Sequence, residues 1–273
     1  LVHMQGRGTF EGCTVTGNID CGIAVGDGGN PLVRDCVFRD GKKGGILVHM
    51  QGRGTFEGCT VTGNIDCGIA VGDGGNPLVR DCVFRDGKKG GILVHMQGRG
   101  TFEGCTVTGN TLSGIAVGDG SNPLVRDCEF GESSDGAGIL VYDHGRGAFE
   151  RCEARVNTFA NIVARQGGNP TVSDCTIRDS LAGAGILVSE RGKGRFDRCE
   201  VTGNALAGIE IREGGDPVVR WSRFTGNGWG TNILADGRGT MSECTVVGNI
   251  NADWWVEVGA GGIRHGNTPE APR

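Results

Sequence analysis

The sequence lacks several features that define common classes of protein. Proline accounts for only 7 of 273 residues, and no apolar run approaches the ~18 residues that a membrane helix requires. The formal net charge of −5 gives no basic excess of the kind that nucleic-acid-binding proteins usually carry. No segment shows the 3.6-residue apolar period of a helix, and no signal peptide opens the chain. We therefore expect no helices, no nucleic-acid partner and no membrane span.

Glycine, in contrast, is abundant, with 54 of 273 residues against the roughly 7% that is usual in proteins. The sequence also repeats itself. Residues 1–46 are identical to residues 47–92, and the identity continues through residue 110. Because natural repeats diverge, we interpret the copy as a very recent duplication or as deliberate construction. We favour an engineered array, lengthened from a recognition segment of a larger bacterial protein.

Each 46-residue unit divides into two similar halves of 23 residues. Gly-Ile recurs once per half, as at Gly22-Ile23 and Gly45-Ile46, among short runs such as GIAV, PLVRD and CVFRD. Such runs, bounded by Gly, Asn, Asp or Pro, are typical of strands of three to five residues joined by turns. Three short strands in about 23 residues predict one coil of an all-β, right-handed parallel β-helix over residues 1–258. Stacking is required, because one coil buries too little apolar surface to offset its ordering.

Two core positions flank each repeated cysteine, and their sizes exchange from coil to coil. The larger residue comes first in the pair Phe10 and Val15 but second in the pair Val33 and Phe38. This exchange keeps the interior volume of each coil nearly constant. The residue after the first core position alternates between glutamate and arginine. Opposite charges on adjacent strands stabilise by roughly 0.2–1 kcal/mol per pair, so we predict that both alternations fix the register of stacking.

Ten of the twelve cysteines recur at one position of the coil, where Ser222 fills the single gap. We interpret them as a structural column of buried thiols, because C-x-x-C zinc pairs are absent and stacked side chains suit disulfides poorly. Free thiols predict a reducing, cytoplasmic setting. Cys21 and Cys67 stand outside the column. The predicted column comprises Cys13, Cys36, Cys59, Cys82, Cys105, Cys128, Cys152, Cys175, Cys199 and Cys244.

The phrases GGILVHMQGRGTFEGCTVTGN and GNPLVRDCVFRDG resemble the right-handed β-helix repeats of the pectate-lyase-like superfamily. The closest resemblance is to the CASH-type repeats of bacterial β-helix proteins and of an F-box ubiquitin-ligase substrate receptor. The resemblance covers roughly residues 1–258 and implies a solenoid whose activity, if any, lies along one strand face. It implies no particular reaction, because the superfamily contains lyases, hydrolases and binding modules. That family often has asparagine at the bend position, so cysteine there is a departure.

A single site requires unlike groups, and identical coils only repeat the same groups. We therefore expect any site to lie in the later, drifted coils, on the outward face of the Gly-Ile strand. The alternative to a binding site there is a surface of salt-bridged side chains. Lyases and hydrolases of the superfamily generally use this face, so the resemblance implies binding of anionic sugars. The candidate binding residues are Tyr142, Asp143, His144, Arg165, Glu190 and Arg212. No catalytic residue, metal ligand or cofactor site is predicted.

The same face carries an apolar column from Ala24 through Leu187, which predicts docking of a protein, a carbohydrate or another copy of the chain. At the N-terminal end, an uncapped coil predicts end-to-end self-association. Near the C-terminal end, we expect Trp254 and Trp255 to cap the core, with Val256 and Val258 facing inward. Residues 259–273 are expected to form a flexible tail or linker.

Three functions remain open from the sequence. The favoured one is a structural or binding solenoid without catalytic activity, which presents a long flat surface as a scaffold. The first alternative is a carbohydrate-binding or polysaccharide-degrading module, in which case it would be a polysaccharide lyase or glycoside hydrolase. The second is a protein-recognition module. Incubation with acidic polysaccharides, followed by assays for unsaturated or reducing ends, separates the first two.

Overall fold

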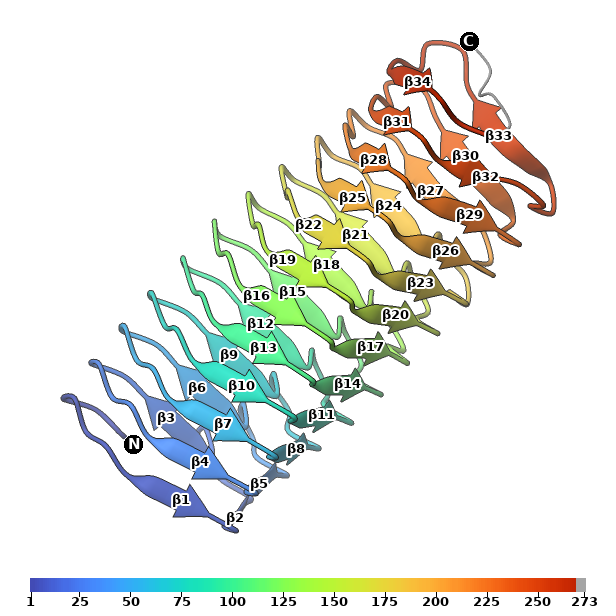
Figure 1. Ribbon diagram of the computed structural model, residues 1–273. Coiled ribbons are helices and arrows are strands. Elements are labelled where there is room, and N and C mark those ends of the chain that lie inside the picture. The colour runs from blue at the N-terminus through green and yellow to red at the C-terminus, as the bar shows by residue number, and fades with distance from the viewer. Residues whose placement is uncertain (269–273) are drawn as a thin grey trace.

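The computed structural model describes residues 1–268, which contain 34 β-strands and no helix. All the strands pair in parallel, and the chain visits three sheets in turn, so that each strand pairs with the third strand after it. The result is an elongated, three-sided solenoid with the two chain termini at opposite ends (Figure 1). This architecture confirms the predicted parallel β-helix, with three strands in each coil of about 23 residues.

The three sheets run the length of the molecule, and each takes one strand from every coil. Sheet 1 contains β1 (Thr9–Glu11), β4 (Leu32–Arg34), β7 (Thr55–Glu57), β10 (Leu78–Arg80), β13 (Thr101–Glu103), β16 (Leu124–Arg126), β19 (Ala148–Glu150), β22 (Thr171–Ser173), β25 (Arg195–Asp197), β28 (Val218–Arg220), β31 (Thr240–Ser242) and β34 (Ile263–His265). Sheet 2 contains β2 (Thr14–Thr16), β5 (Val37–Arg39), β8 (Thr60–Thr62), β11 (Val83–Arg85), β14 (Thr106–Thr108), β17 (Glu129–Gly131), β20 (Glu153–Arg155), β23 (Thr176–Arg178), β26 (Glu200–Thr202), β29 (Arg223–Thr225) and β32 (Thr245–Val246). Sheet 3 contains β3 (Ile23–Val25), β6 (Ile46–Val48), β9 (Ile69–Val71), β12 (Ile92–Val94), β15 (Ile115–Val117), β18 (Ile139–Val141), β21 (Ile162–Ala164), β24 (Ile186–Val188), β27 (Ala207–Ile211), β30 (Trp229–Ile233) and β33 (Ala252–Val256).

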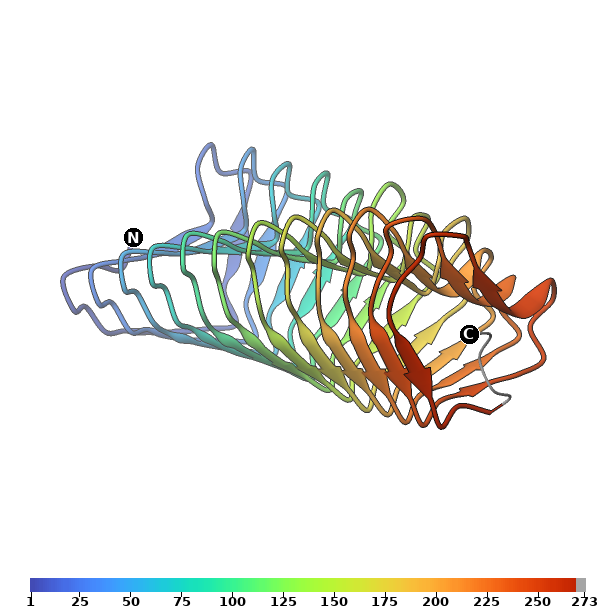
Figure 2. The ribbon, with the colours of Figure 1, turned by 90° about the horizontal axis from the view of Figure 1, so that it is seen from above.

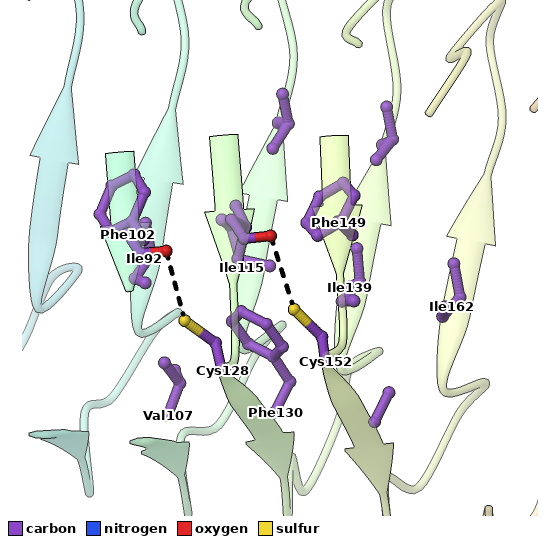
Figure 3. Close-up of a cluster of buried hydrophobic side chains, with 14 of the residues drawn as sticks. Ile92, Phe102, Val107, Ile115, Cys128, Phe130, Ile139, Phe149, Cys152 and Ile162 are labelled. Carbon is purple, nitrogen blue, oxygen red and sulfur yellow. Dashed lines mark hydrogen bonds between the residues drawn. The ribbon is translucent and has the colours of Figure 1, made fainter. Parts of the chain in front are cut away.

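The core lies between the three sheets and shows the predicted exchange of large and small residues. One coil places Phe102 in sheet 1 and Val107 in sheet 2, and the next places Val125 and Phe130 in register with them. All four side chains are fully buried. Phe102 and Phe130 therefore lie in neighbouring coils on different sides of the core, where their rings interleave along the axis (Figure 3).

The outward charges of sheet 1 also pair across coils, as predicted. Arg80 Nε lies 2.8 Å from Glu103 Oε2, and in the drifted part of the chain Arg126 Nε lies 2.9 Å from Glu150 Oε2. Each arginine thus pairs with the glutamate of the following coil. These side chains are about a third to a half exposed, so each pair contributes only about 0–1 kcal/mol. Their larger effect is on register, because a one-coil slip would set like charges side by side.

The bend between sheets 1 and 2 holds the cysteine column. The residue before each cysteine has a left-handed backbone, with φ of 61° at Gly58 and 50° at Asp81. In this column, the Cys105 N–H lies 3.3 Å from Cys128 Sγ, and Cys128 Sγ lies 3.0 Å from the Arg126 carbonyl oxygen. Figure 3 shows two of these thiols directed toward carbonyl oxygens of the preceding coil. All twelve cysteines are free thiols.

A second column, of asparagines, supports the bend between sheets 2 and 3. Asn64 Oδ1 accepts a hydrogen bond from the Gly41 N–H at 3.0 Å, and Asn64 Nδ2 donates to the Phe38 carbonyl oxygen at 3.2 Å. In the drifted coils the amides also bond to one another, because Asn204 Nδ2 donates to Asn227 Oδ1 at 2.8 Å. The sequence pattern predicts these asparagines only as turn residues. The structure shows that they satisfy buried backbone groups.

The C-terminal end differs from its prediction in two respects. In β33, Trp254 continues the inward column and packs against the core, but Trp255 points outward and is 53% exposed. Only one indole therefore covers the core. Val258, which was also expected to face inward, lies beyond the strand and is 97% exposed. The solenoid also continues past the expected boundary at residue 258, because β34 pairs with β31 and Thr268 bridges to Thr245. Of the expected tail, residues 269–273 lie outside the described residues.

Candidate functional site

A groove of about 590 Å³ lies on the outer face of sheet 3, near the middle of the molecule. Its floor is formed by the middle residues of successive strands, from Leu93 in β12 to Val163 in β21. One wall is formed by the turns that enter these strands, where Leu112 and Phe159 are 42% and 49% exposed. The sheet 3 groove, as we name it, is therefore apolar along its floor and along this wall.

Tyr142 lines the other side of the groove, directly after β18. Its ring covers Gly118 of the preceding coil, where an added Cβ would lie 2.7 Å from Tyr142 Cζ. A larger residue at position 118 would therefore displace the ring. Burial of the hydroxyl, and then the nearby carboxylates of Asp119 and Asp143, raise the pKa of Tyr142 above its ordinary value. At neutral pH the site thus offers an aromatic face together with a phenolic hydrogen-bond donor.

Arg165 lies beside Tyr142 in the groove, directly after β21. Its backbone N–H donates to the Val141 carbonyl oxygen at 3.0 Å, which holds the residue in the stacked column. Arg165 Nε is buried without a hydrogen-bond partner, and its guanidinium forms no ion pair with the rest of residues 1–268. Arg212, two coils further on, instead lies 3.3 Å from Glu210 Oε1. Of these two arginines, only Arg165 remains uncompensated.

The structure therefore unites two of the six predicted site residues, Tyr142 and Arg165, in the groove. The other four extend along the same edge of sheet 3 without lining it. Asp143 and His144 are exposed on the turn after β18, and Glu190 lies on the corresponding turn after β24. Of these four residues, only Arg212 forms an ion pair within residues 1–268, with Glu210 and Glu213.

The predicted apolar column of sheet 3 is exposed only in part. Its members are half-buried through Leu140, but Val163 and Leu187 are only 1% and 6% exposed. The turn before β18 is one residue longer than the turn before β15. Ala137 of this longer turn and Ala160 of the next turn pack against Val163 and Leu187. The prediction of a continuous exposed stripe is therefore wrong at its C-terminal end.

Several groove residues were not singled out from the sequence. Lys89 and Asp66 line the wall as an ion pair, with Nζ 3.3 Å from Oδ1. Cys67, which the sequence analysis placed outside the cysteine column, also reaches the groove, but burial raises the pKa of its thiol to about 11, so the thiol stays protonated at neutral pH. Leu112 and Phe159 could have been found from their place two residues after a repeated asparagine, where an apolar residue in a turn is unexpected.

Within residues 1–268, no cluster of three or more His, Cys, Asp or Glu side chains is arranged to hold a metal ion. The same residues include no helix long and apolar enough to cross a membrane. The chemistry that the groove offers is therefore that of an aromatic ring, a guanidinium, an ion pair and an apolar floor.

The chain belongs to the right-handed β-helix family, whose model matches residues 1–130 and 114–268. This match confirms the right-handed β-helix that the sequence resemblance predicts. No curated protein matches the sequence.

Several solved structures share the fold. The A-module of the mannuronan C-5 epimerase AlgE6 from Azotobacter vinelandii matches with a TM-score of 0.71 and 15% identity, over 97% of this chain and 81% of the module. The periplasmic alginate epimerase AlgG matches with a TM-score of 0.62 and 12% identity, over 90% of this chain and 70% of that protein. The pectate lyase Pel9A matches with a TM-score of 0.55 and 15% identity, over 91% and 71%. At these identities the similarity shows the fold.

Proposed function

We propose that the protein binds an acidic oligosaccharide in the sheet 3 groove, with Arg165 holding a carboxylate and Tyr142 packing against a sugar ring. The observation that carries the proposal is Arg165 itself, an uncompensated guanidinium in a groove whose apolar floor partly excludes water. A guanidinium of this kind binds a carboxylate through two parallel hydrogen bonds. The several structural neighbours that are named for alginate or pectate give the ligand class its support. The proposal concerns binding and assigns no reaction.

Arg165→Gln tests the proposal directly. Titration of wild-type protein with a tetramer of mannuronate should show saturable binding, and the variant should bind at least about tenfold more weakly. The physical reason is that a hydrogen bond to a charged partner contributes roughly 1.5–3 kcal/mol. Tyr142→Ala should also weaken binding of the tetramer. A short neutral oligosaccharide should bind neither to wild-type protein nor to either variant.

A matched control is Arg85→Gln, which removes an arginine from the outer face of sheet 2, where Arg85 pairs with Asp86 at 2.7 Å. This variant should bind the tetramer as wild type does. Equal binding by Arg165→Gln and wild type would contradict the proposal, as would the absence of any binding by wild type. Assays for unsaturated and reducing ends in the same samples would show whether binding leads to cleavage.

A protein ligand is a second candidate, and the exposed rim formed by Leu112 and Phe159 favours it. Such a rim would suit an extended peptide with apolar anchors. Selection from a random peptide library should then enrich apolar sequences that Phe159→Ser no longer binds. A library that yields no enriched sequence would argue against this candidate.

A further inference from the structure

A row of basic residues follows the corner between sheet 3 and sheet 1 along the length of the solenoid. Each member stands at the same place in its coil, immediately after a tight turn, and each is exposed. Because these corners succeed one another along the axis (Figure 2), the side chains form a line on one edge of the molecule. We name it the basic row, which comprises Arg7, Arg53, Arg99, Arg146, Lys193 and Arg238.

The backbone fixes each member of the row in place. In the coil of Arg53, the Gly52 N–H donates to the His49 carbonyl oxygen at 2.7 Å, across a turn whose two central residues, Met50 and Gln51, have φ of 45° and 59°. Arg53 follows this turn, and its own N–H donates to the Gly29 carbonyl oxygen of the preceding coil at 2.8 Å. The same pair of bonds recurs at the other members that have a preceding coil. The row is therefore held by the stacking itself.

The cations of the basic row are uncompensated, unlike those on sheet 1. None of the six forms an ion pair within the part of the chain that the structure describes. The arginines of the sheet 1 ladder, such as Arg34 and Arg80, each pair with a glutamate at 2.8 Å. A line of free positive charge thus crosses a molecule whose formal net charge is −5.

The row persists where the repeated sequence has drifted. In the first coils its regularity follows trivially from the identical copies, but Arg146, Lys193 and Arg238 lie beyond residue 110, where the copies differ. The outward residue that opens the same turn changes from His95 to Tyr142 and later to other residues. The glycines on both sides of each cation are retained with it, as the turn requires, but the turn requires no charge on the residue between them.

The coils between the cations place a second kind of group on the same line. Asn30 aligns with Arg7, and Asn76, Asn122 and Asn169 occupy the corresponding corners of later coils, whereas Asp216 occupies the corner between Lys193 and Arg238. These asparagines are exposed, and their side chains make no hydrogen bond within residues 1–268. From Arg7 to Lys193 the line therefore alternates a cation with a neutral amide, and Asp216 ends this alternation. Successive cations are two strand spacings apart, roughly 9.6 Å, and the eight coil steps from Arg7 to Lys193 extend over roughly 38 Å.

We propose that the basic row binds a linear acidic polysaccharide that lies parallel to the solenoid axis and carries one anionic group on every second sugar. An extended pyranose chain advances by about one strand spacing per sugar, so each acidic sugar meets a guanidinium or ammonium group and each neutral sugar meets an amide. Guanidinium groups pair with carboxylates and sulfates, and amides bond to hydroxyls. The ligand class rests on the proposed function, but the surface, its residues and its dependence on length are separate from the sheet 3 groove.

The experiment compares two triple variants by titration with hyaluronan fragments, which carry one carboxylate per disaccharide. The row variant is Arg53→Gln, Arg99→Gln and Arg146→Gln. The control variant is Arg34→Gln, Arg80→Gln and Arg126→Gln, which removes the same charge from the sheet 1 ladder. We expect wild-type affinity to rise with fragment length up to about ten sugars and to fall as salt increases. The row variant should bind a decamer about tenfold more weakly, because each exposed pair contributes only about 0.2–1 kcal/mol.

The outcomes separate this proposal from that for the groove. The proposal for the basic row is supported if the row variant loses binding of the hyaluronan decamer and retains binding of the mannuronate tetramer. This support holds even if Arg165→Gln has no effect on binding of the tetramer. An equal loss in both triple variants would mean that net charge alone governs binding and would overturn the row. Decamer binding that depends on Arg165 but not on the row would overturn it as well. The thermal midpoint of the row variant should match wild type, since its side chains are exposed and unpaired.

Discussion

The first 110 residues and the drifted remainder build the same coils but differ in what they add to them. In the identical part, the asparagine column is interrupted by Gly41 and Gly87, and each outward feature recurs every second coil. In the drifted part, amides follow one another without interruption from Asn204 to Asn249. The sheet 3 groove lies where the two parts meet, because its lining comes from both.

This difference separates the requirements of stacking from the requirements of a site. The exchange of core sizes and the cysteine bend occur in both parts, so they are what a coil needs in order to stack. Tyr142 and Arg165 have no counterparts in the identical coils, where the corresponding positions hold histidine or glycine. A single groove therefore depends on departures from the repeat, whereas the basic row depends on the repeat itself.

The largest expected effect concerns the asparagine column. Asn204 accepts from the Ser180 N–H and from Asn161 Nδ2, and it donates to Asn227 Oδ1 and to two carbonyl oxygens. Asn204→Ala should lower the free energy of unfolding by about 3 kcal/mol or more, because several buried groups lose their partners. Asn64→Ala, in the interrupted part, should cost only about 1–2 kcal/mol. Denaturant unfolding of the two variants checks the difference, and equal losses would contradict it.

The smallest expected effect is on acid stability. Asp127 and Asp174, in the drifted part, each hold an arginine through two hydrogen bonds of 2.7–2.9 Å, and these arginines lower the pKa of both carboxyls below the ordinary 3.8. Each pair is therefore fully present above pH 3.8 and is lost as the pH falls through the lowered pKa. Both carboxylates are well exposed, so the contribution is a few tenths of a kcal/mol.

The double variant Asp127→Asn and Asp174→Asn should flatten the decline in stability with falling pH in this range. The matched control is Asp35→Asn with Asp81→Asn, at the same bend in the identical part, where neither aspartate has an ion pair within residues 1–268. A series of thermal midpoints between pH 2 and pH 6 measures both. A control that flattens as much as the double variant would contradict the assignment.

The fold could be predicted from the sequence because its rules are local and repeated. Any 46 residues show the exchange of large and small core residues, such as that between the pair Phe102 and Val107 and the pair Val125 and Phe130. The exchange has a physical reason only if the coils stack. The burial of Val163 and Leu187 could not be predicted in this way. These two residues pack with Ala137 and Ala160 of the turns that enter the strands, and the strand pattern does not describe the packing of those turns.

The site was only partly predictable for a similar reason. Tyr142 and Arg165 stood out as unlike groups in one column, but the groove wall comes from turns whose packing the strand pattern does not describe. The basic row was not predicted, because its cations and the asparagines between them fall in two different phrases, QGRGT and GGNPL, which align only once the coils are stacked. Trp255 faces outward because β33 pairs it with Asn232, a register that two adjacent tryptophans cannot reveal.

Two deletions test most directly whether coils stack through a two-coil alternation. Removing residues 47–92 leaves every type of contact between coils intact, whereas removing residues 47–69 stacks Phe38 on Phe84 and sets Arg34 beside Arg80. We predict that the one-coil deletion is at least about 2 kcal/mol less stable toward denaturant than the two-coil deletion, although it retains one coil more, because overpacking and voids cost 1–3 kcal/mol or more. A one-coil deletion that is as stable as the two-coil deletion, or more so, would contradict the account.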